Sequence, residues 1–88
     1  MSEEDDNRRK RVAFRCHHTG MRENDLLFGA FVDRHLHELS DADVDWLERL
    51  VMEHDDLDLN NWMTGRAPVP VELDHPVMRA LKSFKFTV

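Results

Sequence analysis

A chain of 88 residues suffices for one small domain, which buries about 60–65% of the surface of its unfolded chain. The formal charge of −6 argues against nucleic-acid binding, because that function normally requires a strongly basic surface. A ligand pocket of about 300–1,000 Å³ is hard to enclose in so short a chain, so we do not expect an enzyme.

The composition also bears on the cellular compartment. The single cysteine, Cys16, cannot form an internal disulfide, which suits a reducing compartment. No apolar run approaches the roughly 18–20 residues that a membrane span needs. The chain starts with acidic residues, unlike signal peptides and mitochondrial presequences. We therefore expect a cytoplasmic protein without membrane insertion.

The first helix is predicted over about 7–18, after an acidic tail over residues 1–6 that we expect to be disordered. The helix opens with a basic run over residues 7–11. That run is either a solvated first turn, which we favour, or a patch for a phosphate or an acidic partner. The apolar residues that follow, among them Val12 and Cys16, supply a surface to bury.

The second helix, about 22–38, is the strongest prediction. Phe28, Val32 and Leu36 form part of a wide apolar face at i, i+4 spacing. Gly29 lies inside this helix, and close approach of a neighbouring helix is the expected reason. Gly20, just before it, is expected in the left-handed conformation that ends many helices.

The third helix, about 41–54, is predicted to start at Ser40, with a capping hydroxyl and Asp43 three residues later. Val44, Leu47 and Leu50 belong to its buried stripe. An acidic face lies opposite. The residues of that face are Asp41, Asp43, Asp45, Glu48 and Glu53.

Two shorter helices complete the prediction. A helix over about 56–64 ends at Gly65, and two prolines keep the following segment extended. Asp74 is expected as the N-cap of the last helix, about 75–84, with Pro76 in its first turn. No period-2 alternation of any length occurs, so no sheet is expected. The chain is predicted to be all-α, a single compact five-helix bundle over residues 7–88.

The residues that often carry chemistry form no recognised catalytic or metal-binding pattern. Adjacent histidines such as His17 and His18 point apart on a helix, and one cysteine is too few for a zinc site. Cys16 is expected to be a buried, inert thiol. Trp46 and Trp62 are expected in the core. We therefore predict no catalytic residue, no metal site and no stably bound cofactor.

The segment between the first two helices is the expected partner-binding site. Gly20-x-x-Glu23, followed by Asn24-Asp25-Leu26-Leu27, resembles the signature of the SdhE family, the succinate dehydrogenase assembly factors. Residues 62–65 with two later prolines, and residues 77–81, resemble further parts of that family. The resemblance covers about residues 11–85. This chain departs from the signature at Thr19, where the family has arginine.

The resemblance implies a helical protein that binds the flavoprotein subunit of succinate dehydrogenase, or of a homologous fumarate reductase, in the bacterial cytoplasm. Such a factor promotes covalent attachment of FAD to its partner. Gly20 and Glu23 are the matching contact residues, Gly20 for close backbone approach and Glu23 for a charge-assisted hydrogen bond. The neighbours expected to take part are Thr19, His18, Arg22 and Asp25.

A different class of function remains open from the residues themselves. The acidic face of the third helix would suit an antitoxin-like or adaptor module that docks on a basic partner. Charge reversal at Asp45 or Glu48 would disable such an adaptor, whereas loss of function in a folded Glu23→Ala variant would favour the assembly factor. DNA binding through residues 8–11 is a weaker hypothesis because of the negative net charge.

Overall fold

The structure is a computed structural model of the chain and describes residues 3–84. Within that range the chain forms five α-helices and two short 3-10 helices, and no residue lies in a strand. The predicted all-α, five-helix fold is therefore confirmed. The α-helices are α1 (Glu3–His17), α2 (Arg22–His35), α3 (Asp41–Glu53), α4 (Asp56–Thr64) and α5 (Pro76–Ser83). The 3-10 helices are η1 (Leu36–Glu38) and η2 (Val71–Leu73).

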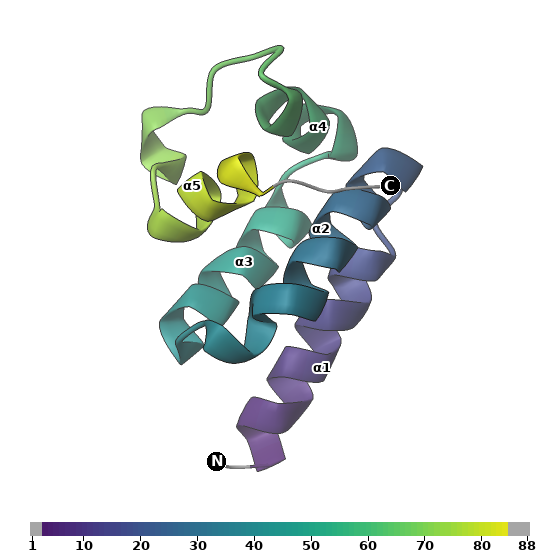
Figure 1. The fold of residues 1–88 in the computed structure, drawn as a ribbon, viewed down its shortest axis with the longest axis vertical. Helices are drawn as coiled ribbons and strands as arrows, with labels where there is room; N and C mark the ends of the chain where they lie inside the picture. Colours follow the sequence, from purple (N-terminus) through teal and green to yellow (C-terminus); the bar gives the residue numbers. More distant parts are fainter. Residues whose placement is uncertain (1–2, 85–88) are drawn as a thin grey trace.

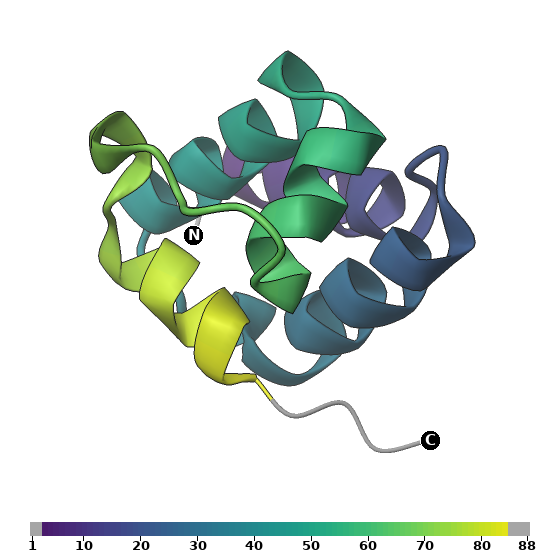
Figure 2. The same cartoon turned by 90° about the horizontal axis from the view of Figure 1, so that it is seen from above.

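The first three helices run up, down and up beside one another, and α4 and α5 lie together at one end of this group (Figure 1). Helix α1 packs on both α2 and α3, while α4 contacts α2 and α5 contacts α3. The view from above shows α4 and α5 on the opposite side of α2 and α3 from α1 (Figure 2). None of the described helices is both long and apolar enough to cross a bilayer.

One apolar core joins all five α-helices. It includes Cys16, as predicted, and Trp62, whose residual exposure is 8%. Trp46 is only partly buried against the core and stacks on the ring of His75, with 4.3 Å between ring centroids. The buried apolar residues are Val12, Cys16, Phe28, Phe31, Val32, Val44, Leu47, Leu50, Leu59, Trp62, Val77, Met78 and Leu81.

Helix α1 begins at Glu3 rather than at about residue 7. Residues 3–6, which we expected in a disordered tail, are therefore helical. Acidic side chains near a helix N-terminus interact favourably with the helix dipole, so the acidic start supports the helix. The division of the chain into a tail over residues 1–6 and one domain over residues 7–88 otherwise stays a prediction.

The basic run of α1 is solvated in part, since Asn7 and Lys10 are exposed, but Arg9 makes contacts inside the fold. The guanidinium of Arg9 donates to the carbonyl oxygens of Leu36 and Leu39, at 2.6 and 2.8 Å, and pairs with Asp41 at 3.1 Å. These contacts join α1 to the first residue of η1 and to the residue that follows it. Helix α2 ends at His35, just before these contacts and three residues earlier than the predicted end.

Three predicted features are confirmed. The Oγ of Ser40 accepts a hydrogen bond from the amide of Asp43 at 3.1 Å, which caps α3. Gly65 has a φ of +79° and ends α4 in the left-handed conformation. Gly29 is buried against α1, and a Cβ there would lie 2.5 Å from Nδ1 of His17, so the expected close approach of helices is confirmed as well.

Two predicted caps are wrong. Gly65 is the one glycine with positive φ among residues 3–84, so Gly20 does not have the expected left-handed conformation. The N-cap of α5 is His75 rather than Asp74, and Nδ1 of His75 accepts from the amide of Val77 at 3.0 Å. Pro76 holds the residue before it extended, which is the N-cap conformation, and this places the cap at His75.

Candidate functional site

The six predicted site residues lie in the corner between α1 and α2, residues 18–25, which is shaped by a short-range contact. The backbone amide and the hydroxyl of Thr19 both donate to Oδ1 of Asp25, each at 2.6 Å. Asp25 lies in the first turn of α2, where a carboxylate also suits the helix dipole. Because Met21, the N-cap, makes no side-chain cap bond, this contact is the main link between the corner and the helix start.

Helix α4 begins directly against this corner. A Cβ on Gly20 would collide with the carboxylate of Asp56, so the glycine permits the close approach of α4. Asn24 is fully buried, donates to the main-chain oxygen of Asp56 at 2.9 Å and accepts from the amide group of Asn60 at 3.3 Å. This bridging role of Asn24 was not predicted from the sequence, although an amide side chain inside an apolar helix face indicates a buried hydrogen bond.

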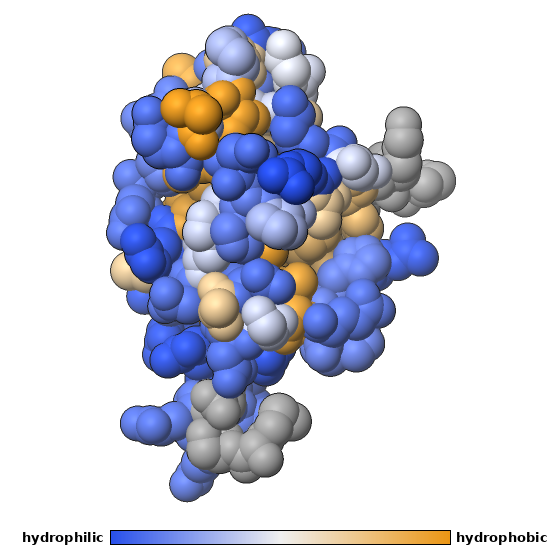
Figure 3. Space-filling view, turned by 90° about the vertical axis from the view of Figure 1, so that its left-hand side faces the viewer, coloured by the Kyte–Doolittle hydropathy of each residue, from blue (hydrophilic) through white to orange (hydrophobic). Residues whose placement is uncertain are grey.

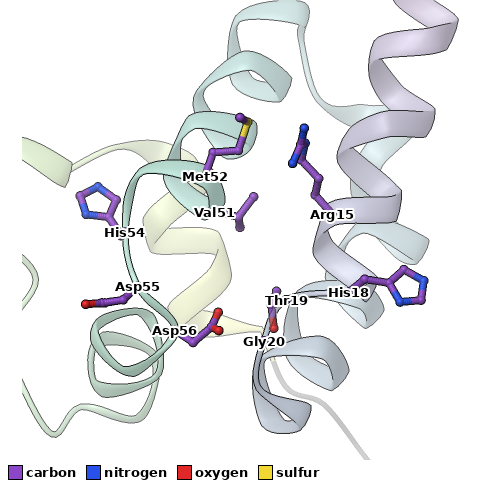
Figure 4. A pocket seen from close by; sticks show the side chains of 9 residues that line it. All are labelled: Arg15, His18, Thr19, Gly20, Val51, Met52, His54, Asp55 and Asp56. Carbon is purple, nitrogen blue, oxygen red and sulfur yellow. The ribbon is translucent and has the colours of Figure 1, made fainter.

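On one side of the corner lies an open depression of about 470 Å³, which we call the polar hollow. The predicted site residues His18, Thr19 and Gly20 line it. In Figure 4 the Arg15 side chain extends over the hollow, Asp56 points toward Gly20, and the ring of His18 lies at the outer edge. The remaining lining residues are Val51, Met52, His54 and Asp55.

On the other side lies a larger depression of about 580 Å³ between α2 and α4, the α2/α4 groove. Glu23 is exposed at its rim. The groove is mainly apolar, with Arg66 as its one cation. Its lining residues are Met21, Glu23, Leu26, Leu27, Leu57, Asn60, Met63, Thr64 and Arg66.

The structure thus divides the six predicted site residues among different surroundings. His18, Thr19 and Gly20 face the polar hollow, and Glu23 borders the groove. The other two lie elsewhere. Arg22 is exposed and lines neither depression, and Asp25 is half-buried and bonded to Thr19.

Exposed apolar side chains gather around this corner. Among the described residues five large apolar side chains are exposed, and four of them flank the corner. Met52 lines the polar hollow, and Leu26 and Leu57 line the groove. Phe14 packs on His18, with 4.4 Å between ring centroids. This cluster was not predicted from the sequence. Its residues lie beside the buried stripes of their own helices, and their neighbours in the cluster come from other helices.

The fifth exposed residue, Val71, lies in η2, away from the corner. The face on the α5 side is mostly hydrophilic, with apolar patches toward its upper end and near its middle (Figure 3). Exposed apolar side chains that are grouped rather than scattered commonly mark a protein-interaction site. Their grouping therefore identifies the corner, rather than this hydrophilic face, as the candidate interaction surface.

Two common sources of chemical reactivity, metal ligands and an activated thiol, can be checked in the described residues. Residues 3–84 contain no group of three His, Cys, Asp or Glu side chains that could hold a metal ion. Cys16 is buried, and desolvation, followed by the charge of Glu48, raises the pKa of its thiol to about 12. A thiol with that pKa stays protonated and is a poor nucleophile.

The acidic face of α3 is not the free surface that we predicted. Glu48 is buried to 8% exposure and accepts two hydrogen bonds from Arg11, at 2.5 and 3.0 Å. The hydrogen bond from Arg11, with further attraction from Arg15, lowers the pKa of Glu48. Asp45 and Glu53 both lie 3.7 Å from Arg49. Charge that is paired internally is less available to a basic partner, which counts against the adaptor hypothesis.

Comparison with known proteins places the chain in a family. The model of the family described as "Flavinator of succinate dehydrogenase" matches residues 10–85. The "FAD assembly factor SdhE" of Acetobacter pasteurianus is 34% identical over 74 residues, covering 84% of this chain and 67% of that protein. The mitochondrial "Succinate dehydrogenase assembly factor 2" of Dictyostelium discoideum is 32% identical over 75 residues, covering 84% of this chain and 52% of that protein.

An insect relative agrees with these two. The mitochondrial "Succinate dehydrogenase assembly factor 2-B" of Drosophila persimilis is 36% identical over 76 residues, covering 85% of this chain and 48% of that protein. The chain thus spans two thirds of the length of the bacterial relative and about half that of the mitochondrial ones. The match extends from the second half of α1 to beyond α5, and the resemblance seen in the sequence is confirmed. The chain belongs to the flavinator of succinate dehydrogenase (Sdh5) family.

Proposed function

We propose that this chain is an assembly factor that binds the flavoprotein subunit of succinate dehydrogenase, or of a homologous fumarate reductase, and promotes covalent attachment of FAD to it. Membership of the family over residues 10–85 and the printed names of the relatives support this function. The structural observation that carries it is the gathering of exposed apolar side chains around the α1–α2 corner, which contains the exposed Glu23. A location in the bacterial cytoplasm is part of the same proposal, since one relative is a bacterial protein.

The corner residues have two kinds of role in this proposal. Glu23, His18 and Arg22 are exposed and contact the flavoprotein, with Glu23 accepting a charge-assisted hydrogen bond. Gly20 lets the partner approach the main chain. Thr19 and Asp25 are bonded to each other and hold the corner in shape.

The residues of the polar hollow do not fit the pyrophosphate of FAD. Asp56 places a carboxylate against Gly20, and Asp55 also lines the hollow, so these two acids would repel a phosphate. The three glycines of the chain are scattered and form no phosphate-binding loop. We therefore assign the flavin to the partner. The factor acts by stabilising a flavoprotein conformation in which flavin and acceptor side chain are aligned, which is catalysis by positioning.

The test is covalent flavin on the flavoprotein subunit. The subunit is expressed with and without this chain, denatured, and read by in-gel flavin fluorescence at matched protein load. We expect the wild-type chain to raise the fluorescence signal. When the amount of this chain limits the reaction, Glu23→Gln should reduce that increase about tenfold, since a hydrogen bond to a charged group contributes about 1.5–3 kcal/mol.

Glu72→Gln is the matched control, because Glu72 is also an exposed glutamate but lies in η2, away from the corner. It should behave like wild type. Equal fluorescence with and without the chain would overturn the proposed function for this flavoprotein. Equal loss in Glu23→Gln and Glu72→Gln would overturn the location of the site.

A further inference from the structure

We propose that the α2/α4 groove receives an apolar side chain of the flavoprotein subunit, from a segment that also presents a basic residue to Glu23. This inference rests on the proposed function and states which chemistry of the partner the factor recognises. In this arrangement the corner supplies the charge that orients the segment, and the groove supplies the apolar contact that holds it.

The walls of the groove carry apolar surface that the fold leaves open to water. Leu26 of α2 is 45% exposed and Leu57 of α4 is 61% exposed, although both line the same depression. Met63 also lines the groove, and methionine adapts its shape to an inserted side chain. Covering these side chains with an apolar group from the partner removes that surface from water, which favours binding.

The charges at the rim determine which segment fits. Glu23 and Arg66 both line the groove, and neither makes an ion pair or side-chain hydrogen bond with another described residue in the range 3–84. A partner segment with a basic residue toward Glu23 and an acidic or polar residue toward Arg66 complements both. The groove therefore favours a partner segment that carries an apolar side chain together with charges complementary to Glu23 and Arg66.

The groove is held open before any partner arrives. Asn24 joins α2 to the main chain of Asp56 at 2.9 Å, and Asn60 donates to Asn24 at 3.3 Å. Figure 2 shows α4 beside α2 in the resulting arrangement. Walls that are already ordered lower the entropic cost of binding, so a single anchor side chain can contribute substantially.

The first measurement is the Kd of the purified chain for the flavoprotein subunit. Leu57→Ser should weaken binding about tenfold, which corresponds to about 1.4 kcal/mol. Val71→Ser is the matched control, since Val71 is an apolar side chain that is 82% exposed and lies outside the groove. It should change Kd by less than about twofold. Leu26→Ser is a second groove variant, and thermal melts check that each variant is folded.

The second measurement identifies the bound segment. A benzoylphenylalanine at position 57 is photo-crosslinked to the flavoprotein, and the joined peptide is sequenced by mass spectrometry. We expect a segment with an apolar residue close to a lysine or arginine. The groove proposal is overturned by a segment without a basic residue, or by crosslinks from position 23 but none from position 57.

The two proposals fail differently. If the wild-type chain binds the flavoprotein and both folded groove variants bind equally well, the groove proposal is wrong while the assembly function stands. If the wild-type chain neither binds the flavoprotein nor raises its covalent flavin, both proposals are wrong.

Discussion

Thr19 and Asp25 hold the α1–α2 corner together through a single carboxylate oxygen. The amide and the hydroxyl of Thr19 both reach Oδ1 of Asp25 at 2.6 Å. The position at which the family signature has arginine is therefore occupied here by a residue that bonds within the corner. Its polar atoms are directed toward α2, so its role in this chain is to shape the corner.

Removing the Thr19 hydroxyl should destabilise the fold. Thr19→Val keeps the shape of the side chain but leaves Asp25 with one donor fewer, and we expect a loss of about 1 kcal/mol in the free energy of unfolding. Thr19→Ser keeps the donor and should lie closer to wild type. Urea unfolding followed by circular dichroism measures both. A valine variant as stable as the serine variant would contradict the role of the hydroxyl.

Gly20→Ala should lower both stability and covalent flavin. The new Cβ displaces the carboxylate of Asp56, and a cost of about 1 kcal/mol would lower Tm by about 4–8 °C in a domain of this size. In an Asp56→Ala background the clash is absent, so Gly20→Ala should no longer lower Tm. The flavin signal should stay low there, because the partner still meets the added methyl group. Full recovery of the flavin signal would show that the clash with Asp56 alone accounts for the need for glycine at position 20.

Glu48 should make the fold sensitive to acid. Its pKa is lowered by the hydrogen bond from Arg11, so its contribution is present above the ordinary glutamate pKa of about 4.3 and is lost as pH falls through the lower, folded value. Glu48→Gln should cost about 1–2 kcal/mol near neutral pH, because both arginine partners are partly exposed and solvent screens them.

The measurement for Glu48 is urea unfolding between about pH 7 and pH 3. The wild type should lose more stability than Glu48→Gln over the acidic part of that range. Glu53→Gln is the control, since Glu53 is exposed on the same helix and should change little. Parallel pH profiles for wild type and Glu48→Gln would contradict a lowered pKa at Glu48.

Gly29 and His17 should be coupled energetically. A Cβ at position 29 would lie 2.5 Å from Nδ1 of His17, whose Nε2 is bonded to Asp33 at 2.8 Å. Alanine gains about 1 kcal/mol over glycine inside a helix, but here the gain is offset by displacement of the ring. Gly29→Ala should therefore stabilise the His17→Ala variant and not the wild type. A double-mutant cycle by urea unfolding measures this, and additive effects would contradict the contact.

Helix positions followed largely from local signals. The i, i+4 spacing of Phe28 and Val32, the cap at Ser40 and the stop at Gly65 act within a few residues, so the sequence shows them directly. The errors arose where a nearby alternative existed. Asp74 and His75 can both cap a helix, and only the backbone before Pro76 distinguishes them.

The candidate site was predicted in part. The segment that contains Gly20 and Glu23 was identified by resemblance, and the structure brings it between two depressions. The groove itself was not predicted, because Leu26 and Leu57 are thirty-one positions apart and no periodicity relates them. The role of Asn24 was missed for the same reason, since its partner Asp56 lies in another helix.

The sequence by itself determined the helical class, most helix boundaries and the family, because periodicity, capping and motif order are properties of neighbouring residues. Only the tertiary structure decided that Glu48 is buried against Arg11, that Gly20 accommodates Asp56, and that exposed apolar side chains flank the α1–α2 corner. These outcomes depend on which faces of separate helices meet. The packing of these faces is determined by the apolar surface buried over the whole core, and no pattern of neighbouring residues specifies it.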